Sequence, residues 1–266
     1  MVLSVIITAY DKPEITRVHV RECMNSSLLP DEIIVVNDHG KIELEEMLQG
    51  LEKKTKLIYA YIEDDIPWNY TGARNLGFWL SRGDFIVSED NDNIPTKNLY
   101  RDMLRCLQEK PEIGVVRGGG RPLVSQEDVL SKPIGEWKQV GWRAAHDDSF
   151  MMRREVVWKL KGCDERFAGE YGWGATDWTR RLNRAGIGIE RITTPYYTVD
   201  GGDTDVCQCG KSKAERTAAH PKFQCPDCGL FYKRLSYRNY HLARKKTYIQ
   251  PPGSILNFNY VVKYVE

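Results

Sequence analysis

Residues 71–95 read TGARNLGFWLSRGDFIVSEDNDNIP and contain a helical pattern, a strand and a polar turn in succession. The apolar spacing predicts a helix over 72–81, and the apolar run 85–88 predicts a buried strand. Three acidic and two amide residues, 89–93, follow this strand directly. Asp and Asn after a strand are explained either by turn formation alone or by a binding site.

The alternation of strands and helices extends in both directions from this stretch. Strands are expected at 3–10, 32–36, 56–62 and 113–116, and helices from 13 to about 27, at 42–51 and at 96–108. This order predicts an α/β fold with a mostly parallel sheet. Ligands bind such sheets beyond the carboxyl ends of the strands, where 8–11, 37–38 and 89–93 all fall. Three polar clusters at one edge favour a site over turn formation.

The rest of the chain is less regular. Residues 118–142 are rich in Gly and Pro and are expected to form an irregular active-site loop. A helical pattern is expected over 148–186, with an aromatic, Gly-rich interruption at 167–174. We find no internal repeat.

Composition restricts the class of protein. The chain has 266 residues, 41% of them hydrophobic, and a formal net charge of +1, which excludes a disordered or low-complexity chain. It lacks the roughly 18 apolar residues in a row of a membrane span, and it begins without a basic leader. We therefore expect an unprocessed cytoplasmic protein of a bacterium or a phage-infected host, without membrane insertion.

Asp90-Asn91-Asp92 is the strongest chemical signal. Two carboxylates one residue apart on a loop can bind one Mg²⁺ or Mn²⁺ ion that bridges a diphosphate. Together with SVIITAYDKPE (4–14) and EIIVVNDHG (32–40), the stretch 71–95 resembles the GT-A fold glycosyltransferases of the family 2 type, in order and in spacing. Residues 149–186 resemble the acceptor-side segment of that superfamily. The resemblance covers residues 3 to about 190.

The resemblance implies a Rossmann-like GT-A domain. It also implies a metal-dependent hexosyl- or pentosyltransferase that uses a nucleotide sugar, with a UDP-sugar as the first expectation. Arg74 matches the basic residue that lies against the nucleotide, where a guanidinium neutralises diphosphate oxygens. Asp90 and Asp92 match the Mn²⁺ or Mg²⁺ motif. The residues implied to hold the base and ribose are Thr8, Ala9, Tyr10, Asp11, Asn37 and Asp38, with Asn37 where the family usually has Asp.

The general base is harder to place. An inverting transferase needs one to deprotonate the acceptor hydroxyl, but the family's Glu-Asp pair aligns with Gly174 and Ala175. Asp177 is our candidate base, with Glu170 and the cluster 146–148 in reserve. A carboxylate favoured by the helix dipole explains Asp177 equally well. A retaining mechanism needs no such base, so the anomeric outcome stays open.

Aromatic residues flank this segment. Tyr171, Trp173 and Trp178 are expected to form a stacking platform for the acceptor or to serve as ordinary packing.

A cysteine pattern marks the C-terminal part. Four thiolates, Cys207 and Cys209 with Cys225 and Cys228, predict a structural Zn²⁺ site. His241 is a possible substitute ligand. Paired Cys at this spacing are typical of a metal site in a reducing compartment. We therefore expect a GT-A domain over 1–200, a basic four-cysteine zinc-binding module over 201–248, and a C-terminal segment over 249–266 that packs back on the GT-A domain.

Charge is distributed unevenly between these parts. Segment 207–248 has ten basic and two acidic residues, a net +8, which leaves −7 for the rest of a chain whose total is +1. Basic residues interleaved with aromatics suit phosphates and unstacked bases. They fit equally a solubilising face on a structural zinc module that closes the catalytic domain. If the segment binds nucleic acid, the expected acceptor is, for example, DNA with hydroxymethylated bases, as in bacteriophage DNA-modifying glycosyltransferases.

Other functions stay open at this point. They are a cytoplasmic transferase for a cell-surface or capsular glycan, with the zinc module as a structural element, and a non-catalytic nucleic-acid-binding protein on a transferase scaffold. A nucleotidyltransferase fits the order of motifs less well. The oligomeric state is not indicated.

Overall fold

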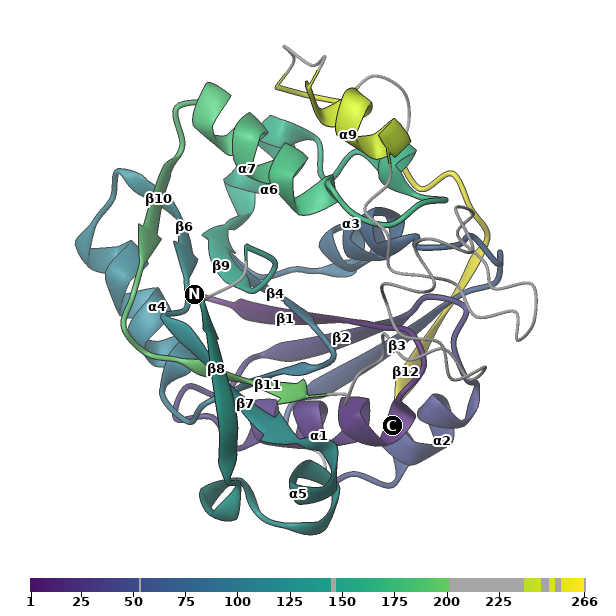
Figure 1. Cartoon of the computed structure of the whole chain (residues 1–266), viewed down its shortest axis with the longest axis vertical. Helices are drawn as coiled ribbons and strands as arrows, with labels where there is room; N and C mark the ends of the chain where they lie inside the picture. Colours follow the sequence, from purple (N-terminus) through teal and green to yellow (C-terminus); the bar gives the residue numbers. More distant parts are fainter. Residues whose placement is uncertain (53, 145–146, 201–236, 245–248, 252–254, 266) are drawn as a thin grey trace, which may run out of the picture.

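The computed structural model describes residues 1–52, 54–144, 147–200, 237–244, 249–251 and 255–265. Its main sheet has eight strands in the order β10-β6-β9-β4-β1-β2-β3-β12 (Figure 1). Their bounds are β1 (Leu3–Ala9), β2 (Glu32–Asn37), β3 (Lys56–Ile62), β4 (Phe85–Asp90), β6 (Ile113–Arg117), β9 (Phe150–Arg153), β10 (Gly188–Arg191) and β12 (Tyr260–Val265).

The centre of this sheet is parallel. β1 pairs in parallel with both β2 and β4, and β2 pairs in parallel with β3. β9 is antiparallel to β4 and β6, and β12 is antiparallel to β3. The parallel α/β fold expected from the sequence is therefore confirmed, with antiparallel additions at β9 and β12.

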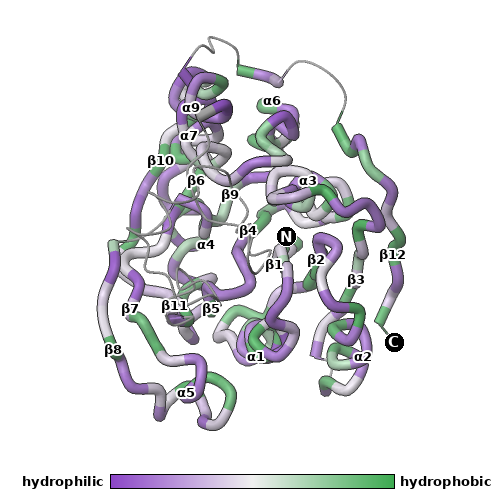
Figure 2. Tube along the Cα trace, turned by 45° about the vertical axis from the view of Figure 1, so that its right-hand side comes forward, coloured by the Kyte–Doolittle hydropathy of each residue, from purple (hydrophilic) through white to green (hydrophobic). Residues whose placement is uncertain are grey.

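Helices cover both faces of the sheet, so the fold has three layers (Figures 1 and 2). α1 (Pro13–Met24), α2 (Glu43–Gln49) and α4 (Leu99–Glu109) pack on one face. α3 (Tyr70–Leu80), α6 (Arg154–Leu160) and α7 (Gly174–Arg184) pack on the other. Alternate residues of β1 enter the two cores, as the period of two in a strand requires. The central strands are thus buried on both sides.

A second sheet lies beside the first, in the order β5-β11-β7-β8. It contains β5 (Asn93–Pro95), β7 (Gly120–Ser125), β8 (Gln139–Ala144) and β11 (Tyr196–Asp200), with α5 (Gln126–Ser131) and a 3₁₀ turn at Ile134–Glu136. The expectation of an irregular loop over 118–142 was therefore wrong. The helical pattern expected from 148 was also wrong at its start, because Phe150–Arg153 is strand β9 and is buried between β4 and β6.

The last described segments pack on the domain. α9 (Tyr237–Arg244) lies against α7 (Figure 1), where Arg180 Nη1 donates to the carbonyl of Ala243 at 3.0 Å. Asn239 Nδ2 donates to the carbonyls of Phe167 and Glu170. The four cysteines of the predicted zinc site lie outside the described residues. Within the described part of the chain, we find no helix with the length and hydropathy of a membrane span.

Candidate functional site

The three polar clusters meet at the carboxyl ends of β1, β2 and β4. The register places Thr8 beside Asp90 and Ala9 beside Asn37. The backbone N–H of Asp38 donates to the carbonyl of Ala9 at 2.8 Å, which joins the first two loops. The sequence-based expectation that these residues share one edge is therefore confirmed.

Several loops at this edge hold non-glycine residues at positive φ. Asp11 and Lys12 follow β1, His39 follows β2, and Trp68 precedes α3, all with φ between 50° and 56°. Trp173, at φ 71°, precedes α7. Residues other than glycine rarely adopt this backbone conformation, and those held in it concentrate at binding sites. The surrounding fold therefore imposes the shape of these loops.

Arg74 is the centre of the site. Its side chain is 2% exposed, and Nη2 donates to Asp90 Oδ1 at 2.9 Å and to the carbonyl of Asp148 at 2.6 Å. Nη1 lies 3.6 Å from Asp148 Oδ1, and the guanidinium lies over the ring of Tyr70 at 4.7 Å. Burial acts to lower the pKa of Arg74, but Tyr70, Asp90 and Asp148 outweigh it and the pKa is raised. Arg74 is therefore a permanent, fixed cation.

The carboxylates of the Asp-x-Asp turn differ in their contacts. Asp90 Oδ1 accepts from Thr8 Oγ1 at 3.3 Å and from Arg74, while its side chain stays 33% exposed. The backbone carbonyl of Asp92 accepts from Val199 N at 2.9 Å, which fixes the turn to β11. The carboxylate of Asp92 makes no hydrogen bond or ion pair with the residues that the structure describes. These hard oxygen donors fit a Mg²⁺ or Mn²⁺ ion.

Asn37 and Asp38 have different surroundings. Asn37 is 1% exposed; its amide donates to the carbonyl of Lys41 and to Tyr59 Oη, and its oxygen accepts from Gly40 N. Its amide hydrogens are therefore used in shaping the turn, which argues against the expected contact with a base. Burial raises the pKa of Asp38 to about 7, although Asn69 Nδ2 donates to its carboxyl. Asp38 can therefore change charge near neutral pH.

Tyr10 and Asp11 remain accessible beside these loops. Tyr10 is 60% exposed, Asp11 is also exposed, and the backbone of both lies against Gly40 of the next loop. An exposed aromatic ring at this edge can stack on a planar base.

Sequence reasoning missed two members of the site and underrated a third. Tyr70 Oη donates to Asp148 Oδ1 at 3.2 Å, and Asn69 reaches Asp38 from the start of α3. Asp148, only a reserve candidate by sequence, is 8% exposed and contacts Arg74 directly. Trp68-Asn69-Tyr70 stands between polar residues and a helix without any periodic pattern, so nothing in the sequence distinguished it from a turn.

The expected base Asp177 is buried away from solvent. It is 1% exposed, and its Oδ2 lies 2.9 Å from Arg181 Nε, on a guanidinium that also donates to the carbonyls of Leu160 and Gly162. A base has to contact the acceptor hydroxyl. The burial of Asp177 and its pairing with Arg181 argue against its expected role as base and fit an ion pair within the fold. Glu170 is 26% exposed and lies 3.6 Å from Arg238 Nε of α9.

The expected aromatic platform is corrected at Trp178. This side chain is 2% exposed and stacks with the rings of Phe78 and Phe150, each with its centroid 6.1 Å away. It belongs to the core. Trp173 packs edge-on against Tyr240, and Tyr171 packs against Trp68 at 5.0 Å. These two remain partly exposed beside the loop that precedes α7.

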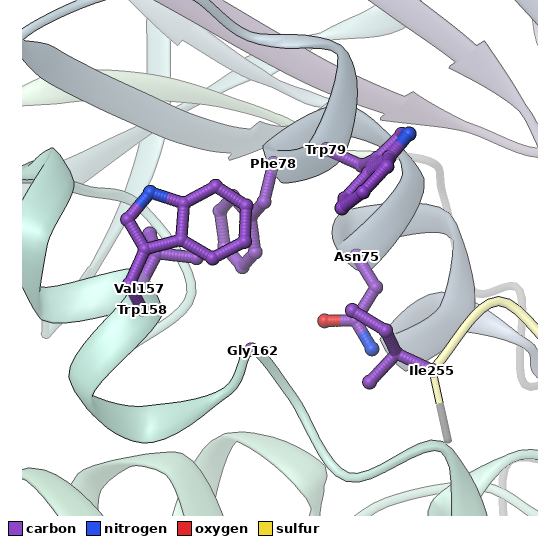
Figure 3. A pocket seen from close by; sticks show the side chains of 7 residues that line it. All are labelled: Asn75, Phe78, Trp79, Val157, Trp158, Gly162 and Ile255. Atoms are coloured by element: carbon purple, nitrogen blue, oxygen red, sulfur yellow. The ribbon is translucent and has the colours of Figure 1, made fainter.

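A small apolar pocket lies elsewhere, between α3 and α6 (Figure 3). Trp79 and Trp158 approach each other edge to face at 6.2 Å on its rim. Its lining contains Asn75, Phe78, Trp79, Val157, Trp158, Gly162 and Ile255, none of which belongs to the site predicted from the sequence.

A family model described as "Glycosyl transferase family 2" matches residues 4–161. The probable glycosyltransferase YdaM of Bacillus subtilis is 26% identical over 185 residues, which are 63% of this chain and 44% of that protein. A hyaluronan synthase of Pasteurella multocida is 26% identical over 131 residues, 49% of this chain and 13% of that protein. The chain thus spans less than half the length of these relatives.

Solved structures share the fold at low sequence identity. TarS 1–349 of S. aureus in complex with UDP-GlcNAc has a TM-score of 0.58 and 13% identity, covering 75% of this chain and 58% of that 1–349 chain. The mannosyltransferase PcManGT of Pyrobaculum calidifontis in complex with GDP-Man and Mn²⁺ has a TM-score of 0.57 and 15% identity, covering 78% and 58%. These likenesses show a GT-A fold, as expected from the sequence.

Proposed function

Because the chain belongs to glycosyl transferase family 2, we propose that it transfers a sugar from a nucleoside diphosphate sugar to an acceptor hydroxyl, with a divalent cation held by Asp90 and Asp92. The observation that carries this proposal is the convergence of Arg74, Asp90 and Asp92 at the carboxyl ends of β1 and β4. A fixed guanidinium beside two carboxylates is suited to a metal-bound diphosphate.

Each group has a distinct part in this proposal. A cation held by Asp90 and Asp92 would offset the negative charge that develops on the leaving diphosphate. Arg74 holds Asp90 and supplies positive charge next to it. Tyr10 and Asp11 lie where the base and ribose are expected, and Asp38 is the polar group of the neighbouring loop.

Two donor classes have support from related structures. TarS was solved with UDP-GlcNAc and PcManGT with GDP-Man and Mn²⁺. We place UDP-sugars first and GDP-sugars second for this chain.

The test is nucleoside diphosphate release from a panel of UDP- and GDP-sugars with Mn²⁺, with Mg²⁺ and with EDTA. We expect metal-dependent release in the wild type and a loss of at least 100-fold in Asp92→Ala. Asp84→Ala is the matched control, because its side chain is exposed before β4, at the opposite end of that strand. Release that persists in EDTA, or that survives Asp92→Ala, would contradict the proposed metal role.

For the acceptor we propose DNA that carries hydroxymethylated bases. The support is the +8 charge of 207–248, a segment that the structure describes only over 237–244. The proposed Zn²⁺ at Cys207, Cys209, Cys225 and Cys228 belongs to the same segment. DNA-stimulated turnover together with salt-sensitive DNA binding is the expected result. Turnover stimulated instead by a glycan would favour the second candidate, which the match to a hyaluronan synthase supports.

Glu170 is our proposed general base, since it stays partly exposed on the loop just before α7. Glu170→Gln should lower transfer to the acceptor while nucleotide binding is kept. Equal transfer rates in Glu170→Gln and the wild type would rule this role out.

A further inference from the structure

A buried polar cluster lies directly beneath the Asp-x-Asp turn. His19 and Cys23 are one helical turn apart on α1, Glu89 is in β4, and Tyr100 is in α4. All four are 0% exposed. His19 Nε2 and Tyr100 Oη both contact Glu89 Oε2, at 3.0 and 2.7 Å, and Cys23 Sγ lies 3.1 Å from Tyr100 Oη.

Packing alone does not explain a carboxylate at the buried position of Glu89. A buried carboxylate is destabilising unless it is paired and hydrogen-bonded. Strand alternation turns Glu89 to the face of the sheet opposite to Asp90, toward α1 and α4. Its Oε1 is buried without a hydrogen-bond partner among the described residues. An apolar side chain at this position would avoid the desolvation penalty of a carboxylate, so the carboxylate requires another explanation.

The cluster connects directly to the turn above it. His19 Nδ1 lies 3.2 Å from the carbonyl oxygen of Asn91, which can only accept, so Nδ1 carries the proton. The side chain of Asn91 donates to Thr16 Oγ1 at 3.0 Å, and its backbone N–H donates to the carbonyl of Thr8 at 3.0 Å. The middle residue of the turn is therefore tied to α1 and β1, with Asp90 and Asp92 on either side.

The charge state of the pair fits this arrangement. Burial acts to lower the pKa of His19, but Cys23 and Glu89 outweigh it and the pKa is raised. A protonated imidazole donates from both nitrogens, to Asn91 on one side and to Glu89 on the other. Glu89 Oε2 accepts from Nε2 at 3.0 Å and so holds the imidazole beneath the turn.

We propose that His19 and Glu89 are positioning residues that fix Asn91 and thereby preorganise Asp90 and Asp92 for the cation. This inference rests on the proposed function for its catalytic meaning. A metal ion within the cluster itself is the less favoured interpretation. The His19, Cys23 and Glu89 ligand atoms lie within 4.8 Å of one another, but the imidazole and the carboxylate already bond to each other at 3.0 Å.

The test compares two buried carboxylates at opposite ends of the sheet. Glu89→Gln and His19→Gln are the variants, and Tyr100→Phe is a milder change that removes one donor to Glu89. Glu32→Gln is the matched control, because Glu32 is 3% exposed and bonds to Ser4 Oγ and Arg82 N at the start of β2. Urea unfolding of each protein identifies effects that follow from stability alone.

The first readout needs no ligand. Hydrogen exchange of the Asn91 amide should accelerate at least 10-fold in Glu89→Gln and His19→Gln relative to Glu32→Gln at matched stability. Exchange equal to that of the control would overturn the positioning role, whether or not nucleotides bind.

The second readout is titration of Mn²⁺ in the presence of UDP or of GDP, followed by calorimetry and by the Mn²⁺ electron paramagnetic resonance signal. Loss of supporting residues around metal ligands commonly weakens metal binding by roughly 10- to 100-fold. We expect a shift of this size in Glu89→Gln and His19→Gln and no shift in Glu32→Gln. Shifts equal to that of the control, or a stoichiometric metal in the purified protein that Cys23→Ser removes, would overturn the inference. A wild type that binds neither UDP nor GDP with Mn²⁺ would refute the proposed function separately.

Discussion

Replacing Arg74 by lysine tests whether the planar guanidinium, and not only its charge, holds the site together. The guanidinium donates to Asp90 and to the carbonyl of Asp148 at 2.9 and 2.6 Å and lies over Tyr70 at 4.7 Å. A lysine keeps the charge but cannot keep this fork geometry. Loss of one charge-assisted hydrogen bond costs about 1.5–3 kcal/mol, and loss of the ring contact about 0.5–1 kcal/mol more.

We therefore expect Arg74→Lys to lower the free energy of unfolding by about 2–4 kcal/mol. Arg74→Met, which leaves two carboxylates without their cation, should lower it by about 3–5 kcal/mol. The assay is urea unfolding of the ligand-free protein followed by circular dichroism, with Arg101→Lys as control because Arg101 is 53% exposed. A change below about 0.5 kcal/mol in Arg74→Lys would refute this account of the site.

Three further predictions concern other parts of the fold. Burial raises the pKa of Asp38 to about 7, so its carboxyl stabilises the fold only while protonated, and this contribution is lost as pH rises from about 4 to 7. Asp38→Asn should therefore unfold at a higher urea concentration than the wild type at pH 8. A difference in urea midpoint between the two proteins that is the same at pH 4.5 would contradict this. Gly77→Ala places a Cβ 2.3 Å from Ile6 Cγ2, so the free energy of unfolding, measured by thermal denaturation, should fall by about 1–3 kcal/mol. An unchanged Tm would disprove the close packing of α3 on β1. Asp177→Asn breaks a buried ion pair and should lower the free energy of unfolding, measured with urea, by about 3–5 kcal/mol, while the turnover per folded molecule is kept. A stable variant with no turnover would show instead that Asp177 is the base.

Much of the fold could be predicted because its central strands are buried on both faces. β1, β2 and β4 are short apolar runs followed at once by polar residues, and both features are visible in the sequence. The site at their carboxyl ends follows from the parallel arrangement alone. Thr8 and Asp90 accordingly lie at one edge, whereas Arg74 was expected there only from the family resemblance.

The second sheet lacked such signals. Every residue of β8 is exposed or half-buried, so no alternation marks it as a strand, and Gly120 and Pro122 make β7 resemble a loop. β9 has a buried apolar run, but it continues directly into α6 and was absorbed into that helical pattern.

The connections within the site were beyond sequence reasoning for a different reason. His19 and Glu89 are 70 residues apart, and Tyr70 and Asp148 are 78 apart. Only the folded sheet brings these pairs together, and no spacing rule applies over such distances. Asp177 illustrates the converse: the family resemblance made it the candidate base, while its first-turn position and its buried partner Arg181 fit an ion pair within the helix.

The position of the cation can be observed by anomalous diffraction from crystals grown with Mn²⁺ and UDP, or with Mn²⁺ and GDP. We predict one strong manganese peak within coordination distance of the Asp92 carboxylate, bridging to the diphosphate beside Arg74. A nucleotide bound without a peak at Asp90 and Asp92, or a peak only among His19, Cys23 and Glu89, would contradict the account.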